Sequence, residues 1–155
     1  MKKLWKPSHS VTLSLAVTYL AGACLLALMV FMPGLMNQWY SSYYAIYDIG
    51  IHPAGLLLLL FYACCPAGIA AIVSLLKLLH NIRRGEVFTR RNVKLLRLLS
   101  WCFVFTALVS VYATYFYYPC ALILAAAAFL AVILRVVKNV MEQATIMREE
   151  QELTI

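Results

Sequence analysis

Two groups of residues in this chain are of types that can take part in catalysis or bind metals. One is a pair of an aspartate and a histidine, and the other is the set of cysteines. Asp48 and His52 stand four residues apart, but no serine or cysteine nucleophile accompanies them in a recognisable motif. The five cysteines all fall inside apolar runs, without a CxxC pair or a histidine at ligand spacing. We therefore predict no catalytic residues, no metal site and no cofactor, and we interpret the cysteines as packing residues.

The composition indicates which solvent surrounds the chain. Of its 155 residues, 65% are apolar and 12% are charged, which is far from the mix of a soluble protein. The net charge of +7 would by itself favour a nucleic-acid or other anionic partner. However, the Lys and Arg residues lie where they orient membrane helices, so we expect an integral membrane protein with no direct nucleic-acid binding.

Four apolar segments must position everything else. The first, Val11 to Met32, follows three lysines, and its length favours a retained helix over a cleaved signal peptide. The third uncharged stretch, Leu98 to Leu134, is long enough for two crossings joined by a tight turn at Pro119. We predict one membrane domain over residues 1–155, with spans at about 11–32, 53–76, 98–118 and 120–137, a connector at 77–97 and a tail at 138–155.

The distribution of positive charge orients these spans. All 13 Lys and Arg residues lie before the first span, in the connector or after Leu134, and none lies in the other two loops. By the positive-inside rule, both termini and the connector are expected in the cytoplasm. On the opposite side, we interpret the Tyr-rich segment from Asn37 to His52 as an interfacial aromatic belt, with a recognition surface for a peptide or lipid as the alternative.

The expected fold class is all-α, an integral membrane four-helix bundle with helix four extended into the cytoplasm. Neither Gly nor Pro follows Pro119, and apolar residues continue past the fourth span at alternating spacings of four and three. This stripe consists of Ile133, Val137, Val140, Ala144 and Met147. We expect it to pack back on helices two and three, and the alternatives are a second copy of the chain or a partner helix.

The connector carries signals for a short link between two helices. Gly85 is predicted to end the second helix, and Thr89 is predicted to cap the third helix at the amide of Asn92. The two helices should therefore meet through the residues GEVF.

Several charges in the predicted cytoplasmic part oppose the helix dipoles. Arg90 and Arg91 open the third helix at its positive end, which predicts compensation by membrane phosphate or by an acid such as Glu86 or Glu142. Glu149 and the acids after it lie at the negative end of the fourth helix, so we expect its last turn to fray.

Small residues at four-residue intervals predict close helix contacts in the spans, because membrane helices associate through tight packing. They are Ser14, Thr18 and Gly22 in the first span and Ala63, Ala67 and Ala71 in the second.

Two further features of the spans bear on function. Pro66 removes the amide that would bond to the carbonyl of Tyr62, which predicts a kink. The uncharged cores hold no ionisable residue of the kind that proton-coupled transporters usually keep there, and Thr12, Ser14 and Thr18 form only a partial polar line. Transport is therefore the alternative and not our main hypothesis.

Two predicted cytoplasmic segments resemble a family of small bacterial membrane proteins known as domain of unknown function family 2975. They are GEVFTRRNVKLLRLLSW (Gly85 to Trp101) and ILRVVKNVMEQA followed by REEQELTI (Ile133 to Ile155), whose ending departs slightly from an EENDLTI-like one. The resemblance implies a bacterial plasma-membrane protein without catalytic residues. Members are often encoded beside a very small Cro-like helix-turn-helix regulator, which implies a membrane partner for a transcription factor or for a stress or peptide response.

We therefore expect a non-enzymatic bacterial plasma-membrane protein, a regulatory or partner-binding module that acts through its cytoplasmic face. The alternative is a small oligomeric transporter, channel or peptide-immunity component. Expected partners are the lipid bilayer and either a small helix-turn-helix regulator or another membrane protein, and a homo-oligomer is a further expectation. The candidate partner or lipid contacts are Phe88, Thr89, Arg90, Arg91, Lys94, Val140, Ala144 and Met147.

Overall fold

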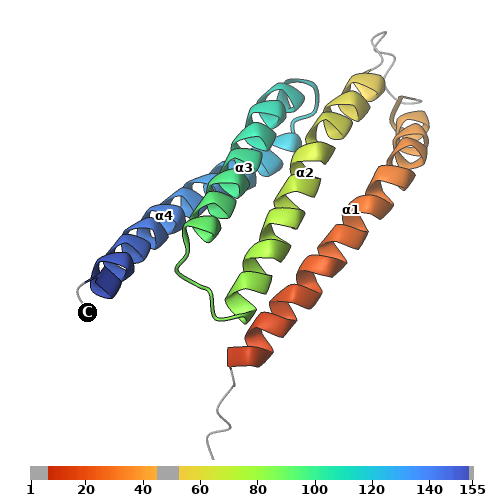
Figure 1. Cartoon of the computed structure of the whole chain (residues 1–155). Coiled ribbons are helices and arrows are strands. Elements are labelled where there is room, and N and C mark those ends of the chain that lie inside the picture. The colour runs from red at the N-terminus through yellow and green to blue at the C-terminus, as the bar shows by residue number, and fades with distance from the viewer. Residues whose placement is uncertain (1–6, 45–52, 154–155) are drawn as a thin grey trace, which may run out of the picture.

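The computed structural model describes residues 7–44 and 53–153, which form four long helices (Figure 1). Their bounds are α1 Pro7–Tyr44, α2 Pro53–Arg83, α3 Arg90–Phe116 and α4 Cys120–Leu153. The helices pack in chain order, and within the described ranges α1 contacts α2 alone while α4 contacts α3 alone. The predicted bundle is thus an open one, with α2 and α3 between the two outer helices.

Each of the four helices contains a segment long and apolar enough to cross a membrane. Large apolar side chains cover their outer faces, and Val30 and Leu122 are 73% and 77% exposed. Such a surface would be costly in water but matches the hydrocarbon of a bilayer. The four predicted spans are therefore confirmed as helices of membrane-crossing length.

The first helix is longer than predicted, because it continues through Pro33 to Tyr44 instead of ending near residue 32. Proline has no amide hydrogen, so Pro33 leaves the carbonyl of Met29 without its usual partner inside the helix. The hydroxyl of Tyr62 on α2 donates a 2.7 Å hydrogen bond to this carbonyl. A neighbouring helix thus satisfies the freed backbone group, which allows the proline inside an apolar helix.

The structure describes only part of the Tyr-rich segment from Asn37 to His52. Its first part, through Tyr44, is helical, whereas Asp48 and His52 lie outside the described residues.

Small residues bring α1 and α2 together, as predicted for Thr18 and Gly22. Thr18 is buried, and a side-chain carbon added to Gly22 would lie 3.4 Å from Ile72 on α2. On the α2 side, Gly68 also lies close to α1, since a carbon added there would lie 3.2 Å from Leu25. Of the predicted alanine stripe, Ala63 is exposed, whereas Ala67 and Ala71 are half-buried and line a hollow together with Leu25 of α1.

The third and fourth helices pack along each other after a turn at Pro119, where the sequence predicts one. Ala127 and Ala131 of α4 are buried, and the hydroxyl of Ser100 on α3 donates a 3.1 Å hydrogen bond to the carbonyl of Ala131. At 1.5 Å per residue, the 34 residues of α4 extend about 51 Å, compared with roughly 30 Å for a hydrocarbon core. An uninterrupted α4 therefore reaches well past one face of a bilayer.

The bond between Tyr62 and Met29 predicts an energetic coupling between Tyr62 and Pro33. Tyr62→Phe should lower the unfolding free energy by about 1 kcal/mol, because the Met29 carbonyl then has no donor. In a Pro33→Ala background, the amide of residue 33 can bond to that carbonyl, and Tyr62→Phe should change stability by less than about 0.3 kcal/mol. Unfolding of the four variants in detergent measures the coupling, and equal effects of Tyr62→Phe in both backgrounds would refute it.

Candidate functional site

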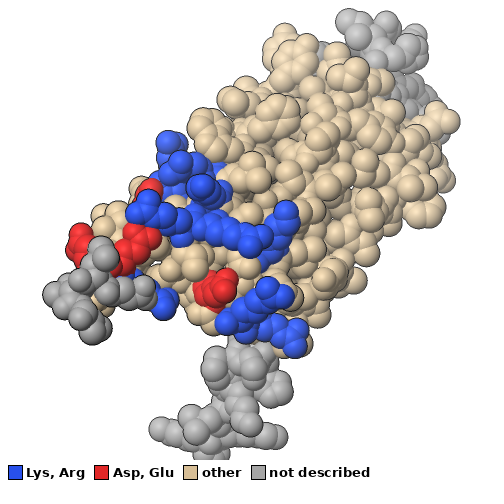
Figure 2. Space-filling model, viewed as in Figure 1, with Lys and Arg blue, Asp and Glu red and all other residues tan. Residues whose placement is uncertain are grey.

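The Lys and Arg residues of the described chain gather at one end of the molecule, where α2 ends, α3 begins and α4 reaches its carboxyl terminus (Figure 2). The opposite end shows none on the face drawn in Figure 2. We call the charged region the polar end.

The turn from α2 into the link is held by backbone hydrogen bonds around Gly85. This residue has a φ of 82°, which glycine adopts without steric cost. The backbone amide of Gly85 donates a 3.0 Å hydrogen bond to the carbonyl of Ile82, and the backbone amide of Glu86 donates one of 3.0 Å to the carbonyl of Asn81. This pair of bonds is a Schellman motif, and it confirms Gly85 as the residue that ends α2.

Asn92 fixes the other side of the link and is the largest fully buried side chain described. Its side-chain nitrogen Nδ2 donates to the backbone carbonyls of Glu86 at 2.7 Å and Val87 at 2.9 Å. Its side-chain oxygen accepts a 2.7 Å hydrogen bond from the side-chain nitrogen Nδ2 of Asn81 on α2. We call this set of contacts the asparagine clamp, because it ties the end of α2, the link and the start of α3 together.

Thr89 begins α3 as predicted. Its hydroxyl accepts a 3.4 Å hydrogen bond from the backbone amide of Asn92, and its extended backbone is typical of a helix cap. Asn92 is therefore used through both its backbone and its side chain.

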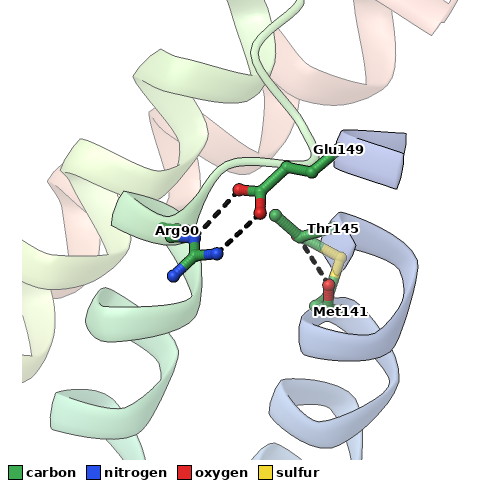
Figure 3. Close-up of polar contacts among 4 residues, drawn as sticks. All are labelled: Arg90, Met141, Thr145 and Glu149. Carbon is green, nitrogen blue, oxygen red and sulfur yellow. Dashed lines mark hydrogen bonds and ion pairs between the residues drawn. The ribbon is translucent and has the colours of Figure 1, made fainter. Parts of the chain in front are cut away.

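The two ends of α3 and α4 that meet here are joined by a bidentate ion pair. Arg90 donates from Nε to Glu149 at 2.9 Å and from Nη2 at 2.7 Å, as Figure 3 shows across the gap between the helices. Thr145, one turn before Glu149, is buried beside the pair and bonds to the Met141 carbonyl. The prediction that an acid compensates Arg90 is confirmed, but the acid is Glu149 and not Glu86 or Glu142, the two examples named. Compensation by membrane phosphate stays a prediction.

A second acid of α4 holds two cations. Glu142 lies 2.8 Å from Nζ of Lys138 and 3.5 Å from Arg97 on α3. Both acids lie beyond the predicted fourth span, and the hydrogen bond from Lys138 lowers the pKa of Glu142, as the one from Arg90 lowers the pKa of Glu149. Both carboxylates are therefore ionised at neutral pH, and α4 is helical to Leu153, past the turn that we expected to fray.

These charges border a hollow of about 200 Å³ between α3 and α4. Val93 and Thr145 line its inner part, and Arg90, Lys94 and Glu142 line its rim. Its small size and charged rim fit a contact surface for side chains better than an enclosed substrate pocket.

The candidate residues of the connector divide into structural and accessible ones. Thr89 is a helix cap, and Arg90 is held by Glu149. Phe88 is 41% exposed, and Arg91 and Lys94 are also exposed, so these three remain accessible for contacts.

The predicted packing of the α4 stripe is wrong. Val140 and Met147 are 60% and 62% exposed, and Ile133 and Val137 are exposed as well. Ala144 is half-buried. The face of α4 that packs on α3 is instead the one with Glu142, Thr145 and Glu149, so the charged residues lie inward and the apolar stripe lies outward.

Sequence reasoning missed Asn81 as well as the side-chain role of Asn92. Two asparagines, four residues before and seven residues after the helix-ending glycine, are a signal that could have been followed. No group of His, Cys, Asp and Glu within the described ranges is arranged to hold a metal ion.

These observations define the class, a multi-pass membrane protein of four apolar helices with a clamped link and an ion-paired polar end. The chain belongs to the family described as protein of unknown function (DUF2975), whose sequence profile matches residues 39–155. The match covers the described parts of α2, α3 and α4, and so includes the clamp and the ion pairs. No curated protein and no solved structure is similar to this chain.

The asparagine clamp predicts a strong effect of one atom. In Asn92→Asp, a carboxylate oxygen replaces the side-chain nitrogen that donates to the carbonyls of Glu86 and Val87. The buried carboxylate and carbonyl oxygens then face each other without a hydrogen bond. We expect the unfolding free energy in detergent to fall by about 2 kcal/mol or more. Asn139→Asp, the same change at an exposed position of α4, should alter it by less than about 0.5 kcal/mol. Equal effects at both positions would contradict the clamp.

The bidentate pair predicts rescue by charge exchange. Arg90→Glu and Glu149→Arg should each lower the melting temperature, because like charges then face each other, and the double variant should recover most of the loss. The recovery should shrink in about 1 M salt, since the pair is partly exposed. Arg135→Glu, an exposed change on α4 outside the pair, is the control for loss of a cation. Losses that simply add in the double variant would show that the pair is not coupled.

Proposed function

We propose that this protein is a non-enzymatic regulatory module of the bacterial plasma membrane that binds a cytosolic protein through its polar end. Its four helices anchor this end at the membrane surface. The observation that carries the proposal is the outward apolar stripe on the part of α4 that extends past the predicted span. Val140 and Met147 of this stripe are 60% and 62% exposed.

The orientation in this proposal comes from charge. The amino terminus, the connector and the tail carry all Lys and Arg residues, which supports placing both termini and the polar end in the cytoplasm. The bacterial plasma-membrane location is what the family resemblance implies.

The surface supports a helical partner with apolar anchors and acidic flanks. Apolar residues of α4 at spacings of three and four form a continuous strip, which is the kind of surface that receives an amphipathic helix. Lys94 lies exposed on the neighbouring helix, beside the hollow between α3 and α4, and would attract acids of the partner. A small helix-turn-helix regulator, implied by the family resemblance, provides short amphipathic helices and is the partner that we propose.

Transport through an oligomer has weaker support. Thr18 belongs to the partial polar line considered for such a path, but its hydroxyl donates a 2.7 Å hydrogen bond to the Ser14 carbonyl of its own helix. The side chain is also buried at the contact with α2. This hydroxyl therefore adds nothing to a water-filled path.

A photocrosslinking residue at Ala144 tests the proposal in living cells. We expect it to capture a small cytosolic DNA-binding protein, which also requires α4 to end in the cytoplasm. The double change Val140→Glu and Met147→Glu should reduce the captured amount about tenfold or more, because both anchors become charged. The matched change Asn139→Glu and Gln151→Glu adds the same charge at exposed polar positions and should leave capture nearly unchanged.

Two outcomes would count against this function. Capture of lipid or of a second copy alone would identify the stripe as a membrane or oligomer contact. Equal loss of capture in both double variants would show that charge, and not the apolar stripe, governs the interaction.

A further inference from the structure

A second hollow, of about 280 Å³, lies at the polar end between α1, α2 and the start of α3. We call it the basic hollow, since four of its lining side chains are Lys77, His80, Arg84 and Arg91. Its lining also includes Leu15 and Tyr19 of α1 and Leu76 of α2, which we call the apolar wall. One hollow thus joins a cationic wall to an apolar wall.

Local structure explains how the cations meet. Lys77, His80 and Arg84 stand three and four residues apart, which places Lys77 and His80 along one face of α2 and Arg84 directly after its last residue. Arg91 comes from the first turn of α3, which the asparagine clamp holds beside the end of α2. Asn81 also lines the hollow, but its amide nitrogen already donates to Asn92, so it supports the wall and does not supply a free donor there.

The cations of the basic hollow lack the ion pairs that the cations beside α4 make. Beside α4, ion pairs join Arg90, Arg97 and Lys138 to Glu149 and Glu142, whereas no ion pair within the described ranges involves Lys77, Arg84 or Arg91. The positive end of the α3 dipole adds to the same field. Three permanent cations therefore converge without an ion pair to any acid of the described residues, and an external anion would lower their mutual repulsion.

We propose that the basic hollow binds the phosphate of an anionic phospholipid, with an acyl chain against Leu15 and Leu76. Guanidinium groups bind phosphate through paired hydrogen bonds. Arg84, directly after α2, and Arg91, in the first turn of α3, provide two such groups. The apolar wall selects a lipid over a soluble phosphate, because a soluble anion would leave Leu15, Tyr19 and Leu76 uncovered. The position at the ends of membrane-length helices is where a phospholipid headgroup lies.

Native mass spectrometry of the whole chain in detergent tests this binding with two lipids of identical acyl chains, phosphatidylglycerol and phosphatidylcholine. The unaltered chain should prefer phosphatidylglycerol, and Arg84→Gln with Arg91→Gln should reduce that preference roughly tenfold or more. The control is Lys94→Gln with Arg135→Gln, which removes two exposed cations outside the hollow and should reduce it by less than about threefold. Glycerol phosphate at millimolar concentration should not displace the lipid.

Three results would overturn the site. Equal losses in the two double variants would mean general attraction to negative charge, displacement by glycerol phosphate would mean a soluble anion, and equal binding of both lipids to the unaltered chain would mean no headgroup recognition. Should the hollow variant fail to fold, the single changes Lys77→Gln and Arg91→Gln, both exposed, replace it, each with an expected loss of roughly threefold to fivefold. Lipid binding here and partner binding at the α4 stripe use different residues, so either can fail alone.

Discussion

The buried side chain of Asn92 sets the geometry on which the polar end depends. It bonds to two carbonyls of the link and to Asn81, so the end of α2 and the start of α3 are fixed relative to each other. Arg90 can reach α4 only because α3 starts at this place, and the basic hollow exists because Arg91 is brought beside α2. The Asn92 side chain is fully buried, so moving it would leave a buried donor or acceptor without a hydrogen bond. This cost holds the side chain in place.

The same requirement explains an irregular feature far from the polar end. In hydrocarbon, a carbonyl that loses its helical partner must find a donor within the protein. Pro33 frees the Met29 carbonyl, and the hydroxyl of Tyr62 supplies the donor. Both this bond and the asparagine clamp involve α2, the helix that contacts both α1 and α3. Side chains of α2 therefore link the open array at two levels, in addition to the close packing of small residues.

The parts that were predictable from sequence are those determined by local structure or by solvent. Apolar length identified the four spans, and the conformation of Gly85 and the capping role of Thr89 follow from their immediate neighbours. The pairing of Asn81 with Asn92, and of Arg90 with Glu149, depends on how helices lie against one another. Sequence patterns contain the candidates for such pairs but not the helix rotation that selects among them.

That rotation matters most for α4. The apolar periodicity of its extension was read as the face that packs, yet the buried face contains Thr145 between Glu142 and Glu149. Ion pairs with α3 explain this orientation, since each charge that opposes its own helix dipole lies beside the opposite dipole end of the antiparallel neighbour. Arg90 thus gains from the carboxyl end of α4, and Glu149 gains from the amino end of α3. Turning the charged face inward leaves the apolar stripe outward, so one set of contacts both fixes α4 and creates its exposed surface.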